Sequence, residues 1–176
     1  RTVNIRVAQE DGGTRYFAGM VNNFRQAGRN REFRYYRATI VPQIWELTQI
    51  VQSRIFQHKS VVEMLRDVFA GYSLRCEIQG DYKPRNYCVQ YQETDFDFAS
   101  RLMEEEGIYY YFEHTADTEI LVLRDNFQKP EDCPTKSDIP IFDEDLNKEV
   151  FYETAIKSFF LSYQLQTGKV SFWDHN

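Results

Sequence analysis

The most concentrated group of side chains that could act as acid or base catalysts is a run of three carboxylates, Glu104, Glu105 and Glu106. They lie in the stretch RLMEEEGIYYYFEH at residues 101–114. A glycosidase uses two carboxylates that face each other across a sugar, about 5–10 Å apart. Successive side chains on a helix are separated by roughly 100°, so three neighbouring glutamates cannot all point into one cleft. We therefore predict that the cluster is not catalytic and that it lies on an exposed or interface-facing surface.

The other residue types that carry chemistry are scattered. The three histidines and three cysteines are His58, His114, His175, Cys76, Cys88 and Cys133. No pair of them has metal-ligand spacing, and an odd, small number of cysteines does not indicate a disulfide framework. The chain contains no phosphate-binding glycine loop and no nucleophile-elbow motif. We predict no catalytic residue, no metal site and no cofactor, and therefore no enzyme.

Arginine and aromatic residues alternate between positions 15 and 37. The set comprises Arg15, Arg25, Arg29, Arg31, Arg34 and Arg37 with Tyr16, Phe17, Phe24, Phe33, Tyr35 and Tyr36. Such a surface can bind single-stranded nucleic acid, whose bases stack on the rings. A strand that alternates core aromatics with outward arginines gives the same pattern. The net charge of −6 argues against a nucleic-acid partner, and we expect none.

Charge is unevenly distributed along the chain. Residues 1–60 contain ten Lys and Arg against four Asp and Glu, a balance of +6, whereas residues 61–176 contain eleven against twenty-three, a balance of −12. Oppositely charged halves suit a subunit that meets copies of itself or a partner, although two solvated surfaces would look the same. No run approaches the roughly 20 apolar residues that a membrane helix needs, and we expect synthesis in a reducing cytoplasm.

The first third of the chain is predicted to be a β-meander. Alternating apolar residues indicate strands at 2–10, 15–26 and 33–41, joined by turns at 11–14 and 28–30. Pro42 stops the third strand because proline has no amide to donate to a sheet. Since the first strand begins with the chain, whose first residue is Arg1, we expect the true start and part of this sheet to lie upstream.

Helices and a hairpin follow. Residues 43–57 are ambiguous and predict a short helix. Ser60 and Glu63 form a capping box that begins a helix over 60–70, with strands at 74–79 and 87–92 after it. Thr94 is the expected N-cap of a second helix over 95–106, and Gly107 its end. A β-hairpin is predicted from strands at 108–112 and 119–124. The segment 126–149 is acidic, contains Pro130, Pro134 and Pro140, and is predicted to be a loop. Strands are predicted again over 150–176, and we expect the given sequence to stop within or just after a strand.

Long segments of the chain resemble the VgrG family, the spike proteins of bacterial type VI secretion systems. Residues 84–96 (PRNYCVQYQETDF) and 100–114 (SRLMEEEGIYYYFEH) are similar to the family's central motif, in which Phe98 fills an aromatic position. Residues 16–21 (YFAGMV), 53–57 (SRIFQ) and 121–125 (LVLRD) resemble further family segments. The resemblance covers almost the whole chain and is weakest over 126–150.

This resemblance implies a mainly β, α+β fold of antiparallel β-barrel-like subdomains with two short amphipathic helices. Residues 1–42 would be part of a first barrel-like subdomain, and 43–125 a helix-containing one. The implied function is a non-catalytic hub, similar to that of contractile phage tails, in a spike that delivers effectors through membranes. A cell-wall hydrolase or glycan-binding module, and a nucleic-acid-binding β-module, are the alternatives.

The implied partners are two further copies of the chain in a trimer, the Hcp tube and baseplate components. A PAAR tip and effectors would join through downstream regions. The protein would be made in the bacterial cytoplasm and then secreted or injected, meeting a membrane only during injection. We place Glu104, Glu105 and Glu106, together with the basic meander of the first third of the chain, at or near candidate subunit contacts in the ring.

Overall fold

The computed structural model describes residues 2–9, 12–126, 139, 141, 155, 156 and 158–163. The chain divides into two compact units, Arg1–Lys129 and Pro130–Asn176. In the second unit, a single parallel bridge joins Ile141 and Ile156 among the described residues. The predicted loop at 126–149 and the predicted strands at 150–176 otherwise lie outside the described residues, and the proposed division into subdomains stays a prediction.

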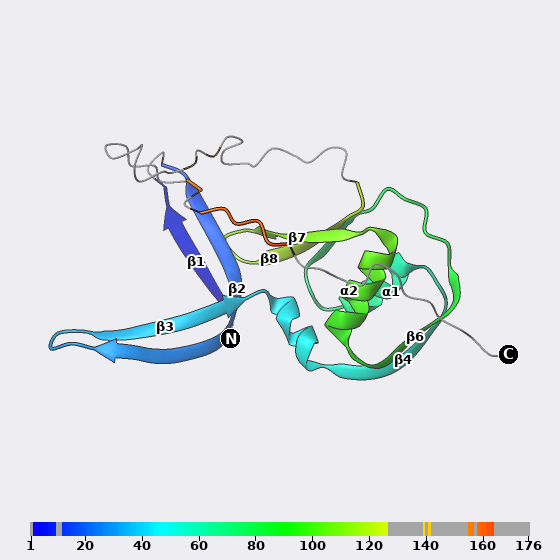
Figure 1. The fold of residues 1–176 in the computed structure, drawn as a ribbon, viewed down its shortest axis with the longest axis horizontal. Coiled ribbons are helices and arrows are strands. Elements are labelled where there is room, and N and C mark those ends of the chain that lie inside the picture. Colours follow the sequence, from blue (N-terminus) through cyan, green and yellow to red (C-terminus); the bar gives the residue numbers. More distant parts are fainter. Residues whose placement is uncertain are drawn as a thin grey trace. The chain divides into compact units, whose positions relative to one another are not determined.

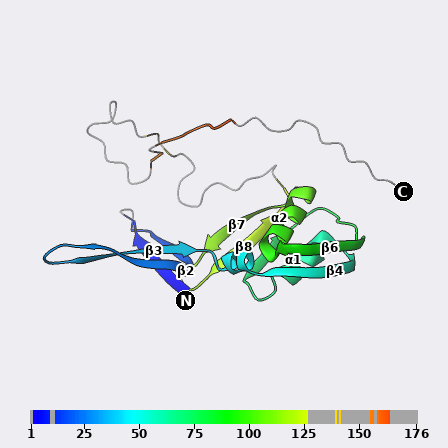
Figure 2. The ribbon, with the colours of Figure 1, turned by 60° about the horizontal axis from the view of Figure 1, so that its bottom comes forward.

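The first sheet confirms the predicted meander. Strands β1 (Thr2–Ala8), β2 (Thr14–Arg29) and β3 (Arg34–Val41) are antiparallel and pair in the order β1-β2-β3 (Figures 1 and 2). The second turn is displaced from its predicted position. Strand β2 continues through Gly28, and the chain reverses at Asn30, whose side-chain oxygen accepts from the amides of Glu32 at 3.0 Å and Phe33 at 2.6 Å. An asparagine that bonds its own backbone makes a turn without glycine.

Gly19 allows β2 to approach β3 closely. A Cβ at this position would lie 2.6 Å from the carbonyl oxygen of Val41. Any larger residue would push the two strands apart, which explains a glycine in the middle of a strand.

Residues 43–57 contain both a helix and a strand. A 3₁₀ helix, η1 (Gln43–Gln49), is followed by β4 (Val51–Lys59), which pairs with β6 (Arg85–Thr94). The prediction of a short helix alone was therefore incomplete. The strand was obscured because its inward positions include the polar Gln52 and Arg54, which break the alternation of apolar residues.

Both predicted helices are present. Helix α1 (Val61–Val68) begins at Ser60 with the complete capping box, and α2 (Asp95–Glu106) begins at Thr94, whose hydroxyl accepts from the Asp97 amide at 3.0 Å. Helix α2 ends at Gly107, which has a left-handed φ of 68°. The end of the helix therefore follows from the one residue type that adopts this backbone without strain.

The predicted hairpin is confirmed, and a third strand joins it. Strands β7 (Tyr109–His114) and β8 (Glu119–Arg124) are antiparallel, and β5 (Leu74–Glu77) pairs with β8 in parallel, giving the order β5-β8-β7. Asp125 secures the connection after β5 by accepting from the Gly80 amide at 2.7 Å and the Tyr82 hydroxyl at 3.0 Å. Sheet pairing between distant segments is invisible to local sequence patterns.

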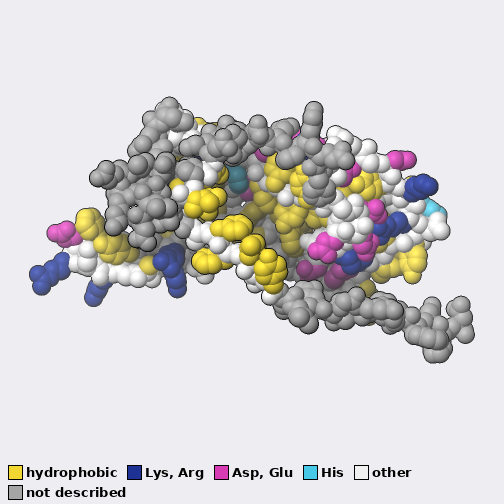
Figure 3. Space-filling model, turned by 45° about the horizontal axis from the view of Figure 1, so that its top comes forward, with side chains coloured by type: hydrophobic (Ala, Val, Ile, Leu, Met, Phe, Trp, Pro, Cys, Tyr) yellow, Lys and Arg dark blue, Asp and Glu magenta, His cyan; other side chains and the backbone are white. Residues whose placement is uncertain are grey.

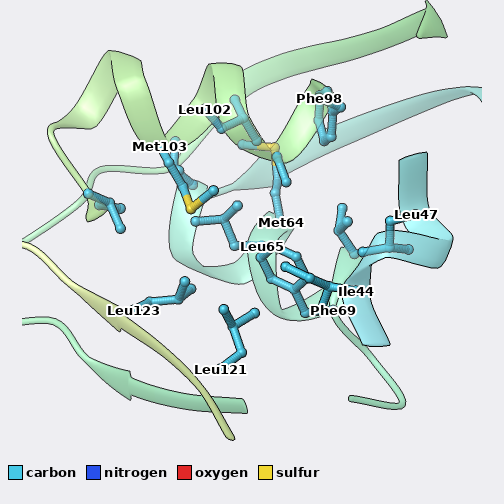
Figure 4. Close-up of a cluster of buried hydrophobic side chains, with 14 of the residues drawn as sticks. Ile44, Leu47, Met64, Leu65, Phe69, Phe98, Leu102, Met103, Leu121 and Leu123 are labelled. Carbon is cyan, nitrogen blue, oxygen red and sulfur yellow. The ribbon is translucent and has the colours of Figure 1, made fainter. Parts of the chain in front are cut away.

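The core forms where the two helices meet η1 and β8 (Figure 4). Its fully buried members include Met64, Leu65, Phe69, Phe98, Leu102 and Leu123. The Phe56 and Phe98 rings stack with their centroids 5.3 Å apart. The predicted mainly β, α+β class is therefore confirmed. The three sheets of the described residues are all open, and no closed barrel is present in this part of the chain.

Candidate subunit-contact surface

The three glutamates lie at the C-terminal end of helix α2, next to an arginine from strand β6. Arg85 at the start of β6 donates to Glu105 at 2.7 Å and to Glu106 at 2.5 Å. Two carboxylates thus share one guanidinium on the surface instead of facing each other across a cleft. The prediction that the three glutamates do not converge on one cleft agrees with this geometry.

Arg101 adds a second positive charge beside the cluster. It donates to Glu93 at 2.7 Å and lies 3.5 Å from Glu105. The hydrogen bond from Arg85, with a further contribution from Arg101, holds the pKa of Glu105 below its usual value. Carboxylates at a helix C-terminus are unfavourable to the helix dipole, and these two arginines compensate for that cost.

Glu104 is placed differently from its two neighbours. Its side chain is exposed and makes no ion pair within the described residues. Asp97, seven positions earlier, is exposed as well and lies on the same side of α2, since seven residues make almost two complete turns. The three predicted site residues are thus divided into a paired couple and one free carboxylate.

A buried polar network holds α2 against the β4–β6 sheet. Asp95 is 4% exposed and accepts from Arg54 at 2.7 Å, from Gln90 at 2.8 Å and from Gln52 at 3.2 Å. Gln90 is itself fully buried. The network was missed because its members come from three separate elements.

The arginine and aromatic side chains of the meander are exposed together. Phe24, Phe33, Tyr35 and Tyr36 are between 52% and 66% exposed. Figure 3 shows dark blue arginine side chains beside yellow apolar ones at the end of the molecule that the β2–β3 hairpin forms. The interpretation of these four rings as core residues of a meander was therefore wrong, because no other element of the described residues covers this part of the hairpin.

Two contacts attach the meander to the β7–β8 hairpin. The Ala18 amide donates to His114 Nδ1 at 3.2 Å, and the Asn4 side chain donates to the Asp117 carbonyl at 3.3 Å. The His114 ring also lies 5.8 Å from the Phe17 ring. His114 is therefore a structural residue at this junction, and no group of described His, Cys, Asp or Glu side chains around it could hold a metal ion.

A small cavity lies beside Glu119, at the start of β8. Its Oε1 accepts from the Gln43 amide, and its Oε2 is buried with no hydrogen-bond partner among the residues that the structure describes. Burial raises the pKa of Glu119, although the Gln43 amide and the charge of His114 act in the opposite direction. The cavity measures ≈ 10 Å³, which is room for roughly one water molecule and far too small for a sugar.

Among the described residues, no three His, Cys, Asp or Glu side chains gather as metal ligands would. None of the helices there combines the length and apolar character required to span a bilayer.

Comparison with known proteins gives one consistent result. The family model described as phage tail baseplate hub (GPD) matches residues 1–176. The chain is 34% identical to the type VI secretion system spike protein VgrG1b of Pseudomonas aeruginosa over 182 residues, which covers 100% of this chain and 24% of that protein. It is 41% identical to VgrG1a of the same organism over 130 residues, or 72% of this chain and 20% of that protein.

A solved structure supports the same fold. The E. coli c3393 protein, described as a type VI secretion component with structural similarity to the T4 bacteriophage tail proteins gp27 and gp5, superposes with a TM-score of 0.62. The match covers 66% of this chain and 35% of that one. At 24% identity it supports a similar fold and nothing further. This chain spans about a quarter of the length of the spike proteins that it matches.

Proposed function

Because the chain belongs to the phage tail baseplate hub family, we propose that it forms part of the hub of a type VI secretion puncturing spike. The observation that carries this proposal is the match of the family model over all 176 residues, with spike proteins as relatives. The family is a structural one, which confirms the prediction that this region is not catalytic. The hub would act by mechanical fit between subunits and not by making or breaking bonds.

The finer assignments concern assembly. The hub would be a trimer seated on the Hcp tube and in contact with baseplate components. A PAAR tip and effectors would be carried by parts of the spike outside this chain. The protein would be made in the cytoplasm and exported with the spike, meeting a membrane only during injection. These assignments are supported by two spike proteins that match this chain over its whole length.

The barrel-like architecture belongs to the same proposal. Each sheet of the described residues has two edge strands, and exposed edges in native proteins are commonly covered by other segments. Strands from other parts of the intact spike, or from neighbouring subunits, would complete the barrel-like subdomains around these open sheets.

The candidate contact at Glu104, Glu105 and Glu106 is also proposed here. Its support is that Glu104 is exposed and unpaired among the described residues, while Glu105 and Glu106 are both paired with Arg85. Glu104 is therefore the member of the cluster that is available to a neighbouring subunit.

The hub function is tested in the full-length spike protein. Deleting the segment equivalent to residues 1–176 should abolish the appearance of tube protein in the culture medium, because the tube would have no hub to rest on. Undiminished export would contradict the proposal. For the contact itself, Glu104→Lys should lower the trimer mass measured by light scattering, whereas Asp81→Lys, an exposed carboxylate in a loop, should leave it unchanged. A full trimer in the Glu104→Lys protein would remove that residue from the interface.

A further inference from the structure

The distal half of the β2–β3 hairpin is an arm that no other described element covers. Every residue from Asn22 to Thr39 is exposed, whereas Val21 and Ile40, at its base, are partly buried. Figures 1 and 2 show this hairpin extending away from the helices and from the β7–β8 hairpin. We refer to residues 22–39 as the arm.

The arm is ordered by its own contacts. The Phe24 and Tyr36 rings stack with centroids 5.5 Å apart and planes within 10° of parallel. At the tip, the Asn30 side chain donates to the Tyr35 hydroxyl at 2.9 Å. A two-stranded hairpin without a covering layer is at best marginally stable in water, so an arm with four large exposed rings gains stability from a surface that covers them.

The charge of the arm is also uncompensated. It contains Arg25, Arg29, Arg31, Arg34 and Arg37 against the single acid Glu32, a balance of +4. Arg25 lies directly opposite Arg37 in the ladder, and Arg29 lies opposite Arg34. Like charges in facing positions destabilise a strand pair. None of the five makes an ion pair with any residue that the structure describes.

These features together favour an acidic protein surface as the occupant. With the arm at +4 and the whole chain at −6, the remainder of the chain carries −10. Each copy of the chain therefore presents both a basic arm and an acidic body. The arm's arginines make no ion pair with the described part of their own chain, which favours a complementary surface on another molecule. The acidic body would repel a nucleic acid that approached the arm.

We propose that the arm of one copy docks on the exposed side of helix α2 in a second copy. Asp97 and Glu104 form the acidic receiving surface, since both are exposed and neither is ion-paired within the described residues. The aromatic rings of the arm would be covered by the same contact. This inference rests on the proposed hub function and identifies which two surfaces of the subunit meet.

A charge-swap experiment on the full chain tests the docking. Arg34→Glu with Arg37→Glu should weaken self-association measured by sedimentation equilibrium at least about 10-fold, since opposed charges across an interface become like charges. Asp97→Arg with Glu104→Arg should do the same. Mixing the two double variants should restore association between them, because each then carries the complement of the other. Raising salt from about 0.1 M to 1 M should weaken the native association.

The matched control is Arg6→Glu with Lys83→Glu. Both residues are exposed and lie outside the arm, so this variant has the same change in net charge and should associate normally. Circular dichroism and thermal unfolding check that each variant is folded. Unchanged association of the arm variant, no recovery in the mixture, or a monomeric native chain at all concentrations would each overturn the docking. A further outcome would also overturn the docking: the native chain binds a single-stranded oligonucleotide or anionic vesicles, and the arm variant loses that binding while its self-association is intact.

The docking can fail while the hub assignment stands. Export of tube protein by the full-length spike tests the hub function, and the association constants test the arm. If export requires this region but the arm variants self-associate as the native chain does, only the docking is rejected. Association through the arm without any effect of the region on export would reject the hub function instead.

Discussion

At the scale of single residues, the structure explains side chains whose placement looks unfavourable in isolation. Glu105 and Glu106 stand at the negative end of a helix, yet Arg85 supplies both with a hydrogen-bonded positive charge. Asp95 is buried near the start of the same helix, yet Arg54, Gln90 and Gln52 satisfy its oxygens. Glu119 differs from these, because one of its buried oxygens has no hydrogen-bond partner in the described part of the chain.

The Asp95 network should contribute measurably to the stability of the fold. Asp95→Ala leaves Arg54 and the buried Gln90 without their shared acceptor. Breaking a buried ion pair typically costs 3–5 kcal/mol, and the partial exposure of Arg54 reduces this, so we expect a loss of about 2–3 kcal/mol of unfolding free energy. Chemical denaturation measures the change. Asp97→Ala, exposed in the same turn, should cost under about 1 kcal/mol, and equal effects of the two substitutions would contradict the role of the network.

Glu119 should make stability depend on pH in a definite direction. Burial raises its pKa above the ordinary value of 4.5, so between the unfolded and folded pKa values the native state binds more protons than the unfolded state. Stability then falls as pH rises through that window. Glu119→Gln cannot ionise, and we expect the unfolding free energy of this variant to lack that fall when thermal unfolding is followed from pH 4 upward. Asp81→Asn, an exposed control, should keep the native pH profile. Parallel profiles for Glu119→Gln and the native protein would contradict the assignment.

At the scale of elements, the boundaries are set by a few local devices. The capping box at Ser60, the Thr94 cap and the left-handed Gly107 define the helices. Asn30 reverses the β2–β3 hairpin by bonding its own backbone. The strand β4 has no such local device, and its polar inward residues hide it from pattern analysis.

Gly107 gives a clean test of one such device. No atom lies within 4 Å of the position where its Cβ would be, but its φ is 68°. Gly107→Ala should therefore cost about 1 kcal/mol of stability through the backbone alone, measured by urea denaturation. Gly28→Ala is the matched control, because that site is equally open and has no left-handed φ. A Gly107→Ala protein as stable as the Gly28→Ala protein would show that the helix end does not depend on this conformation.

At the scale of the whole molecule, the first unit combines a packed region with an exposed one. Helices α1 and α2 pack with η1 and β8 into a core, whereas no other described element covers the arm. The two regions should therefore differ in how readily their backbone opens.

Native-state hydrogen exchange should reveal this difference. We expect the amides of the arm, such as those of Arg25 and Arg37, to exchange by local opening, because no other described element covers either face of the arm. Amides of the buried strand β8, such as those of Leu121 and Leu123, should exchange only on global unfolding. When the chain self-associates, their exchange rates should fall less than those of the arm amides. Equal protection of the arm and β8 in the monomeric chain would contradict this picture.

Much of the fold was determined by the sequence alone. The meander, both capped helices, the β7–β8 hairpin and the family resemblance rest on signals within short segments, namely periodicity, caps, turn residues and a long motif. These predictions succeed because each depends on interactions between residues that are neighbours in the chain.

Only the tertiary structure decided which distant residues meet. Arg85 and the glutamates are about twenty positions apart, Arg54 and Asp95 about forty, and β5 reaches β8 from a separate segment. The exposure of the arm is a fact of the same kind, because alternating arginines and aromatics look identical whether or not another layer covers the rings. Burial and charge pairing depend on what lies across space, and the local order of residues carries no record of that.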